Sequence, residues 1–409
     1  MTVAITETCF SSDNTYSSVN LRVEIIKDPE GFLALEAVWN PLLARSGCDT
    51  LFLTYEWLSS CCTHSRDVQQ LFIVVIWNGP AVVAIAPLRV IKSGRFRQLC
   101  MIDNHVSDYK DFIIDDSVNR EQVIREIFDT LDQDDGWDFF MLDNIPADSV
   151  NSLAFDSSLA RYPSGRVVRK EHSPPAFYIP LEGTFDEYYR SLRRSFQEGT
   201  VRFQKKLEKK ALSYSFSKEF DSSRISETVD EIINLNAGKY SGGVFDHPSA
   251  RSFYKYFAQK ACRLGWLSIP TLFINGEIAA RFLDFQYKNI HYYIITCYRS
   301  EYSNYSPGRL LNLWLIKHCF EQGLSEYDML TGAEEYKFQY NVKTRKKYKL
   351  YLFRGGFKGF IIRLCVLNTW ISILRKFYWS CGAKLRRIRY MSEVIDAIKK
   401  IFFGAPGKN

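Results

Sequence analysis

The most constraining feature of this 409-residue sequence is the stretch 290–337, which predicts a strand, a loop, a helix and a second strand in succession. Residues 292–295 are β-branched and aromatic, as in a buried strand. Ser306 is suited to cap the helix N-terminus, Pro307 fits its first turn and Gly323 its end. The next strand surrounds Asp328. This order predicts an α/β unit organised around one strand–helix junction.

The predicted helix start is a candidate anion site, because a helix N-terminus presents free N–H groups and the positive end of the helix dipole. Gly308 permits close approach of a ligand to the backbone, and Arg309 adds a charge suited to phosphate. We therefore expect Ser306, Pro307, Gly308, Arg309 and Leu310 to hold a pyrophosphate. The same residues also fit an ordinary capped helix that packs on a sheet.

Composition indicates a globular chain, since 46% of residues are hydrophobic and 15% aromatic, and its length allows two full-sized domains. The ten cysteines are scattered, without C-x-x-C pairs or Cys/His groupings, which favours reduced thiols and no metal site. Residues 1–18 lack the features of a secretory signal, and no apolar run is long enough to span a bilayer. We expect a cytoplasmic protein.

The positive charge is concentrated near the C-terminus. Residues 341–409 contain 17 lysines and arginines but only two acids, whereas the net charge of the whole chain is +7. The segments 357–378 and 391–403 mix these cations with Trp, Phe, Ile and Leu. Such a tail favours contact with an anionic membrane surface, or packing against the more acidic remainder of the chain.

The chain contains two halves with the same predicted order of elements: helix, helix, antiparallel hairpin, strand, helix, strand. The hairpin turns Asn78-Gly79 and Asn275-Gly276 lie 197 residues apart, and the strands around Asp138 and Asp328 lie 190 apart. This repetition indicates an internal duplication. It predicts an α/β fold, of α+β type, with helices on a mixed sheet.

The predicted organisation has four parts. Residues 1–20 form a mobile N-terminus, 21–165 a first domain without a donor site, 166–355 a second domain with the ligand site, and 356–409 a basic amphipathic tail.

A family resemblance rests on the 306–311 junction, on Gly323 followed by Tyr327-Asp328, and on the motif G-x-E-x-Y-K at 332–337. With the order of elements, these residues resemble the GNAT acyltransferase superfamily. More narrowly, the chain resembles the CelD-like group of tandem GNAT proteins linked to cellulose and exopolysaccharide biosynthesis, which is related to the Fem peptidyltransferases. The resemblance covers about residues 20–355. Weaker support comes from residues 52–57, 107–109 and 193–210.

This resemblance implies an acyl-CoA donor whose pyrophosphate lies on residues 306–310. The strand ending at Thr296 would diverge from its neighbour and admit the pantetheine arm. Lys337 matches a lysine that Fem-type enzymes place at the transfer centre, where a cation stabilises the developing oxyanion. The junction departs from the common GNAT pattern R/Q-x-x-G-x-G/A, because Gly308 is its one glycine.

Other side chains are candidates for proton transfer. Asp284 lies within an apolar strand, where a carboxylate has a raised pKa, unless it faces solvent. Glu334 lies in a loop bounded by glycine, and Tyr298 precedes the junction. Each also fits a structural or solvated role. The basic stretch 193–210 is either a guide for an anionic acceptor or a solvated helix face.

These residues and the family resemblance predict transfer of an acyl group from acyl-CoA to an amine or hydroxyl of a sugar or nucleotide-sugar in envelope or exopolysaccharide assembly. Acetyl is the acyl group that we favour. One alternative is a Fem-type transferase using aminoacyl-tRNA, which is disfavoured by the acidic body and the lack of a coiled-coil insertion. Another is a non-catalytic scaffold recruited to a membrane-bound synthase. We expect no DNA partner.

Overall fold

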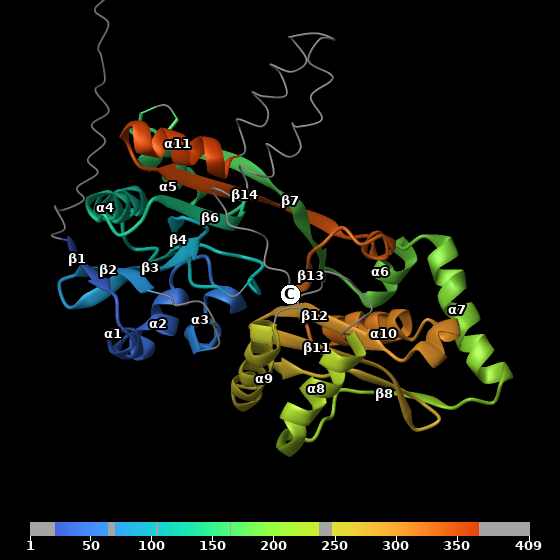
Figure 1. Cartoon of the computed structure of the whole chain (residues 1–409). Helices are drawn as coiled ribbons and strands as arrows, with labels where there is room; N and C mark the ends of the chain where they lie inside the picture. The colour runs from blue at the N-terminus through green and yellow to red at the C-terminus, as the bar shows by residue number, and fades with distance from the viewer. Residues whose placement is uncertain (1–20, 64–69, 104, 164, 237–247, 368–409) are drawn as a thin grey trace, which may run out of the picture.

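The computed structural model describes residues 21–63, 70–103, 105–163, 165–236 and 248–367. A single 14-stranded mixed sheet runs through the molecule and carries helices on both faces (Figure 1). The strands are β1 (Leu21–Ile26), β2 (Gln70–Asn78), β3 (Ala81–Ser93), β4 (Phe96–Met101), β5 (Ile113–Ile114), β6 (Phe139–Pro146), β7 (Val167–Pro180), β8 (Tyr214–Ser217), β9 (Leu267–Ser268), β10 (Thr271–Ile274), β11 (Glu277–Tyr287), β12 (Ile290–Tyr298), β13 (Glu326–Thr331) and β14 (Lys343–Phe353). The α-helices are α1 (Pro29–Ala34), α2 (Glu36–Leu43), α3 (Tyr55–Thr63), α4 (Arg120–Gln133), α5 (Ser152–Leu159), α6 (Phe185–Ser191), α7 (Arg194–Lys209), α8 (Ile225–Asn236), α9 (Pro248–Arg263), α10 (Pro307–Glu321) and α11 (Gly356–Val366).

The strand order is nearly symmetric about the centre of the sheet: β1-β2-β3-β4-β6-β14-β7-β13-β12-β11-β10-β8. In each half, helices precede an antiparallel hairpin, and a further strand and helix lead to a strand parallel to the one before it. Those parallel pairs are β4 with β6 and β12 with β13. The predicted mixed α/β fold with two similar halves is confirmed.

The two central strands are exchanged between the halves. β7 follows the first half in sequence but pairs with β13 of the second, while β14 follows the second half and pairs with β6 of the first. β7 and β14 also pair with each other, from Val167↔Leu352 to Tyr178↔Lys343. In Figure 1 the two strands run side by side from one half to the other. Each half therefore completes its sheet with a strand from the opposite part of the chain.

Both predicted hairpins are present. β2 returns as β3 with Asn78 paired to Ala81, and β10 returns as β11 with Ile274 paired to Glu277. In the second turn Asn275 and Gly276 both have positive φ, 50° and 80°, as a two-residue hairpin turn requires.

Two segments have less regular structure than their apolar patterns favour. The helical spacing of apolar residues over 31–43 is divided at Leu35 into α1 and α2. In the apolar segment 111–114 only Ile113 and Ile114 form a strand, and the Asp111 side chain accepts hydrogen bonds from the Phe112 amide and from Asn151.

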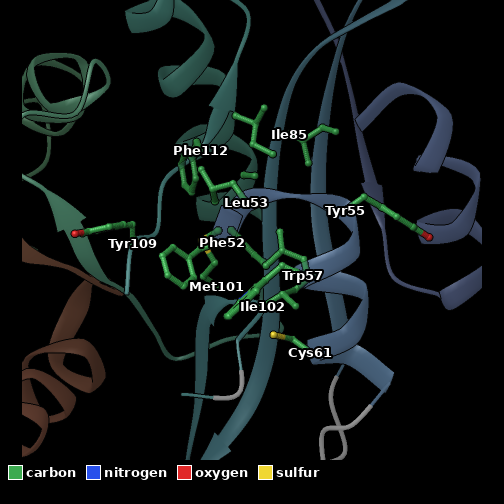
Figure 2. Close-up of a cluster of buried hydrophobic side chains, with 14 of the residues drawn as sticks. Phe52, Leu53, Tyr55, Trp57, Cys61, Ile85, Met101, Ile102, Tyr109 and Phe112 are labelled. Carbon is green, nitrogen blue, oxygen red and sulfur yellow. The ribbon is translucent and has the colours of Figure 1, made fainter. Parts of the chain in front are cut away.

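Aromatic side chains join the halves in one core. The Phe52 ring packs edge-to-face against Trp57 at 4.9 Å and against Tyr109 at 5.6 Å; Figure 2 shows these side chains together. Trp57 in turn lies 4.8 and 4.7 Å from the rings of Phe253 and Phe257 on α9. The first-half helix α3 and the second-half helix α9 are thus held together by apolar packing.

The start of the predicted tail packs on the first half. In α11, Ile362 and Cys365 are buried and Lys358 pairs with Asp138 at 2.9 Å, while Phe357 and Phe360 are exposed. Residues 368–409, including the predicted amphipathic segment 391–403, lie outside the described residues.

Candidate functional site

The parallel strands β12 and β13 pair over only three residues and then diverge. The pairs are Ile290↔Glu326, His291↔Tyr327 and Tyr292↔Asp328, after which β12 continues to Tyr298 without β13 beside it. Because successive strand residues face opposite sides of the sheet, Tyr292 and Tyr293 point to opposite faces. Each of the two tyrosines lines a separate cavity.

The first cavity lies at the N-terminus of α10 and has a volume of about 240 Å³. It brings together most of the predicted donor-binding residues, Thr296 and the junction 306–309, and also Tyr298. Leu310, in the first turn of α10, is buried in the core and does not line the cavity. The remaining lining residues, none of which was predicted as a site residue, are Phe282, Tyr293, Ser303, Tyr336, Gln339 and Tyr340.

Ser306 enters the helix in an unusual conformation. Its φ of 47° and ψ of 55° place it in the left-handed region, and its side chain makes no capping hydrogen bond. Ser306 therefore occupies the predicted N-cap position, but its side chain does not cap the helix. The turn of 3₁₀ helix at Ser300–Tyr305 runs directly into α10 through this one residue, so the extended backbone that a capping side chain needs is not formed. Pro307 occupies the first turn as predicted.

Gly308 leaves the helix start open. A Cβ built at this position would meet nothing within 4 Å, so the backbone of the first turn is accessible from the cavity. Pro307 has no N–H, and the amides of this helix end begin with Gly308. This arrangement fits an anion placed against the end of α10.

Arg309 is held in a fixed position by α7 and by the turn at Lys337–Tyr340. Its guanidinium carbon lies 4.7 Å from the ring centre of Phe196 and 5.5 Å from that of Phe203, both on α7, and its Nη2 donates to Gln339 Oε1 at 2.7 Å. Gly199 of α7 makes room for it, since a Cβ there would lie 3.1 Å from Arg309 Nη1. The arginine thus places a permanent charge at the cavity wall.

Lys337 is buried at the end of β13 and does not line the cavity. Its Nζ donates to the carbonyl oxygens of Thr331 at 3.0 Å and Leu330 at 3.5 Å, and pairs with Glu334 Oε2 at 2.9 Å. Glu334 is half-exposed. The structure brings these two predicted residues together, beside the cavity residue Tyr336.

Asp284 lies apart from both cavities. It is fully buried at a bulge in β11, accepts the Ile294 amide at 2.9 Å and lies 3.2 Å from His291 Nε2. Burial raises the pKa of its carboxyl, and His291 opposes that shift. Neither cavity exposes it to a ligand.

The second cavity lies on the opposite face of β12 and β13, between the halves, with a volume of about 210 Å³. At its wall Asp328 accepts a hydrogen bond from the Tyr109 hydroxyl at 2.7 Å. Burial, with the neighbouring Glu326, raises the pKa of Asp328 to about 7. Arg345 donates to both Glu326 oxygens at 3.0 and 2.9 Å.

Further polar groups of the second cavity have unusual environments. Burial raises the pKa of Asp111 to about 6, against hydrogen bonds from Ser149 and Asn151. The buried Tyr292 hydroxyl and Thr50 Oγ1 have no hydrogen-bond partner within the described part of the chain. Sequence reasoning missed this cavity. Its available signal was Asp328, a carboxylate within the apolar strand 327–330.

No group of three or more His, Cys, Asp or Glu side chains suited to a metal is found among the described residues. The eight cysteines that are described there are free thiols. Among the described helices, none is both long and apolar enough to cross a membrane.

Comparison with known proteins identifies the second half. Residues 188–338 match the family described as acetyltransferase (GNAT) domain. This segment contains the whole first cavity apart from Gln339 and Tyr340. The chain therefore contains a GNAT-superfamily acetyltransferase domain, and the predicted superfamily is confirmed for this part of it.

Two solved structures, with TM-scores of 0.56 and 0.50, share the fold over both halves. The crystal structure of FemX is 10% identical, with a TM-score of 0.56 over 78% of this chain and 96% of that one. A conserved protein of unknown function from Bacteroides thetaiotaomicron VPI-5482 is 14% identical, with a TM-score of 0.50 over 81% and 100% of the two chains. A tandem GNAT protein from the clavulanic acid biosynthesis pathway is 10% identical, with a TM-score of 0.43 over 82% and 99%. No curated protein sequence matches significantly.

Proposed function

We propose that the protein transfers an acyl group from acyl-CoA to an amine or hydroxyl of a sugar or nucleotide-sugar, as in the assembly of an exopolysaccharide or envelope polymer. Acetyl is the acyl group that we favour. The observation that carries the proposal is the cavity at the α10 N-terminus within the GNAT-matching segment. It gathers Thr296, Tyr298 and the 306–309 junction against an open helix end.

The residues of this cavity fit a CoA pyrophosphate. The first turn of α10 offers the Gly308 amide with no side chain over it, and Arg309 adds a charge held between α7 and Gln339. Acyl-CoA supplies a thioester whose carbonyl carbon is open to attack by an amine or hydroxyl. Holding both reactants in one geometry is itself a large part of such catalysis.

The acceptor, in this proposal, occupies the second cavity, across the diverging strands from the donor. Polar groups converge there, and Tyr109 and Tyr292 offer apolar surface to a sugar ring. Asp328 accepts the proton released by the attacking group, since a carboxyl with a pKa near 7 is suited to a general base. Lys337 would stabilise the negative charge that develops on the carbonyl oxygen by exchanging one of the partners that now hold its Nζ, the Leu330 and Thr331 carbonyls and Glu334, for that oxygen.

The proposed localisation is cytoplasmic, with the tail 356–409 bringing the protein to an anionic membrane surface. Phe357 and Phe360, exposed on α11, are consistent with this attachment. Comparing liposome binding of the full chain with that of a chain ending at 355 tests it, because equal binding would refute attachment through residues 356–409.

The donor assignment is tested by calorimetric titration of the purified protein with CoA and acetyl-CoA. Gly308→Glu should weaken binding by about 100-fold or more, because its carboxylate would lie at the pyrophosphate position and repel it. Gly308→Ala is the matched control, since its Cβ meets open space. Unchanged affinity in Gly308→Glu would refute the pyrophosphate site. No binding by the wild type would favour an aminoacyl-tRNA-dependent enzyme or a scaffold.

A further inference from the structure

Helix α7 presents a row of exposed cations beside the first cavity. Arg194 pairs with Glu198, but no ion pair with a carboxylate is found among the described residues for the five cations that follow. These five are exposed: Arg202, Lys205, Lys206, Lys209 and Lys210. A surface of this kind favours an anionic ligand.

Contacts with the α10 entry fix the position of this row. Phe196 and Phe203 of α7 enclose Arg309, as described above. Further along the helix, the ammonium groups of Lys206 and Lys210 lie 5.5 and 5.8 Å from the ring centre of Tyr305.

These two lysines lie next to the residues that enter the anion site. Lys206 Nζ also donates to the Asn304 carbonyl at 3.3 Å. Tyr305 directly precedes Ser306, so both ammonium groups contact the segment that leads into the α10 N-terminus. The other cations of the row make no such contact with this loop.

We propose that Lys206 and Lys210 form a subsite for the 3′-phosphate on the adenosine end of CoA. This inference rests on the proposed function, because it takes the pyrophosphate to lie at residues 306–309. With the pyrophosphate at residues 306–309, Lys206 and Lys210 would be the exposed cations next to the entry of α10 that have no carboxylate partner within the described part of the chain. Lysine ammonium groups bind phosphate as point charges, and their exposure lets them reorient towards it.

The experiment compares CoA with 3′-dephospho-CoA, which lacks only this phosphate, by calorimetric titration at fixed low salt. The wild type should bind CoA about tenfold more tightly than 3′-dephospho-CoA. In the double variant Lys206→Gln/Lys210→Gln this ratio should fall close to one, through a loss of CoA affinity. The matched control Lys205→Gln/Lys209→Gln removes the same charge from the same helix and should keep the wild-type ratio.

Three results would overturn the subsite while leaving the donor site intact. They are equal affinity of the wild type for both ligands, a ratio that persists in the Lys206/Lys210 variant, and an equal fall of the ratio in the control. An equal fall of the ratio in the control would show that the preference for CoA comes from the overall positive charge of α7 and not from Lys206 and Lys210. Absence of binding to both ligands would instead refute the proposed donor, and the subsite with it.

Discussion

At the scale of single residues, two buried ionisable groups, Lys337 and Asp328, combine a structural role with a proposed chemical one. Lys337 satisfies two backbone carbonyls at the end of β13 as well as Glu334. Asp328 accepts bonds from Tyr109 and the Leu330 amide, yet its carboxyl remains partly protonated near neutral pH because burial disfavours its charge. Both groups therefore couple any catalytic role to the stability of the fold.

Lys337→Met should reduce both stability and turnover. It removes the donor that satisfies the Leu330 and Thr331 carbonyls, so the free energy of unfolding should fall by about 1–3 kcal/mol. Acyl transfer should slow while CoA affinity stays unchanged. Urea denaturation, initial rates and titration measure the three quantities. Glu334→Gln, at a half-exposed carboxylate, is the control with a smaller loss of stability, and wild-type turnover in Lys337→Met would remove the lysine from the mechanism.

Asp328 should make stability depend on pH. Its pKa is about 7 in the folded protein and about 4 when unfolded, so the folded state holds the proton more tightly. Its contribution to stability is therefore greatest below pH 4 and is lost as pH rises towards 7. Asp328→Asn should flatten the dependence of the unfolding free energy on pH between 5 and 8, measured by urea denaturation. An unchanged slope would show that this carboxyl is not the group responsible.

At the scale of elements, the entry into α10 concentrates backbone strain at the proposed donor site. A left-handed conformation costs a residue with a Cβ roughly 1–2 kcal/mol, and Ser306 adopts it where Pro307 must begin a helix. Strained backbone of this kind persists where the surrounding structure holds it in place. Here the turn Ser300–Tyr305, α7 and the Pro307 ring fix the approach of the chain.

Substitution of Ser306 should separate strain from binding. Ser306→Gly relieves the strain and should leave the melting temperature equal or higher, whereas Ser306→Val should lower it, because a β-branched residue tolerates this conformation poorly. Scanning calorimetry gives both values. CoA titration of Ser306→Gly then reports the part played by the hydroxyl at the cavity wall. A lower melting temperature in Ser306→Gly would contradict the account of strain.

The sequence predicted elements well where the signal is local. Both hairpin turns and the helix α10 follow from neighbouring residues, and the cavity residues of the junction follow from the same pattern. The sequence did not predict β7 or β14. Pro174-Pro175 in β7 is typical of a loop, and the run of lysines in β14 is typical of a solvated segment. The charge of Arg345 in β14 is neutralised by Glu326 and Asp328, which a reading of local sequence does not bring near it.

The residues of the candidate site also fall into those that the local sequence predicts and those that it does not. Thr296, Tyr298 and residues 306–309 lie close in sequence and were identified together. Tyr336, Gln339 and the contact of α7 with Arg309 arise from tertiary packing between segments with no common motif. The second cavity draws residues from both halves, so no single stretch of sequence indicates it.

At the scale of the whole molecule, the exchange of β7 and β14 makes the halves interdependent. β6 has β14 on one side, and β13 has β7, so removal of either part of the chain exposes a strand edge at the centre of the sheet. The shared core at Trp57, Phe253 and Phe257 adds to this dependence. Unpaired edges and divided apolar cores both favour aggregation.

A split chain tests this dependence. The fragment 21–165 expressed alone should be insoluble, because it lacks β14 and half of the shared core. Co-expressed with 166–409, it should be recovered as a soluble complex, measured by co-purification through a tag on one fragment. A monomeric 21–165 fragment that unfolds cooperatively by itself would contradict the interdependence of the halves.

The position of β14 in the sequence also determines how long β6 stays unpaired during synthesis on the ribosome. Its partner β6 is synthesised roughly two hundred residues before β14, a delay on the order of 10–40 s at elongation rates of about 5–20 residues per second. Throughout that interval the nascent first half has a complete complement of helices but an open strand edge. Slow elongation over residues 147–342 would lengthen this exposure, so the yield of folded protein should depend on chaperones that shield the waiting edge and on the speed of translation, even where the final fold is stable.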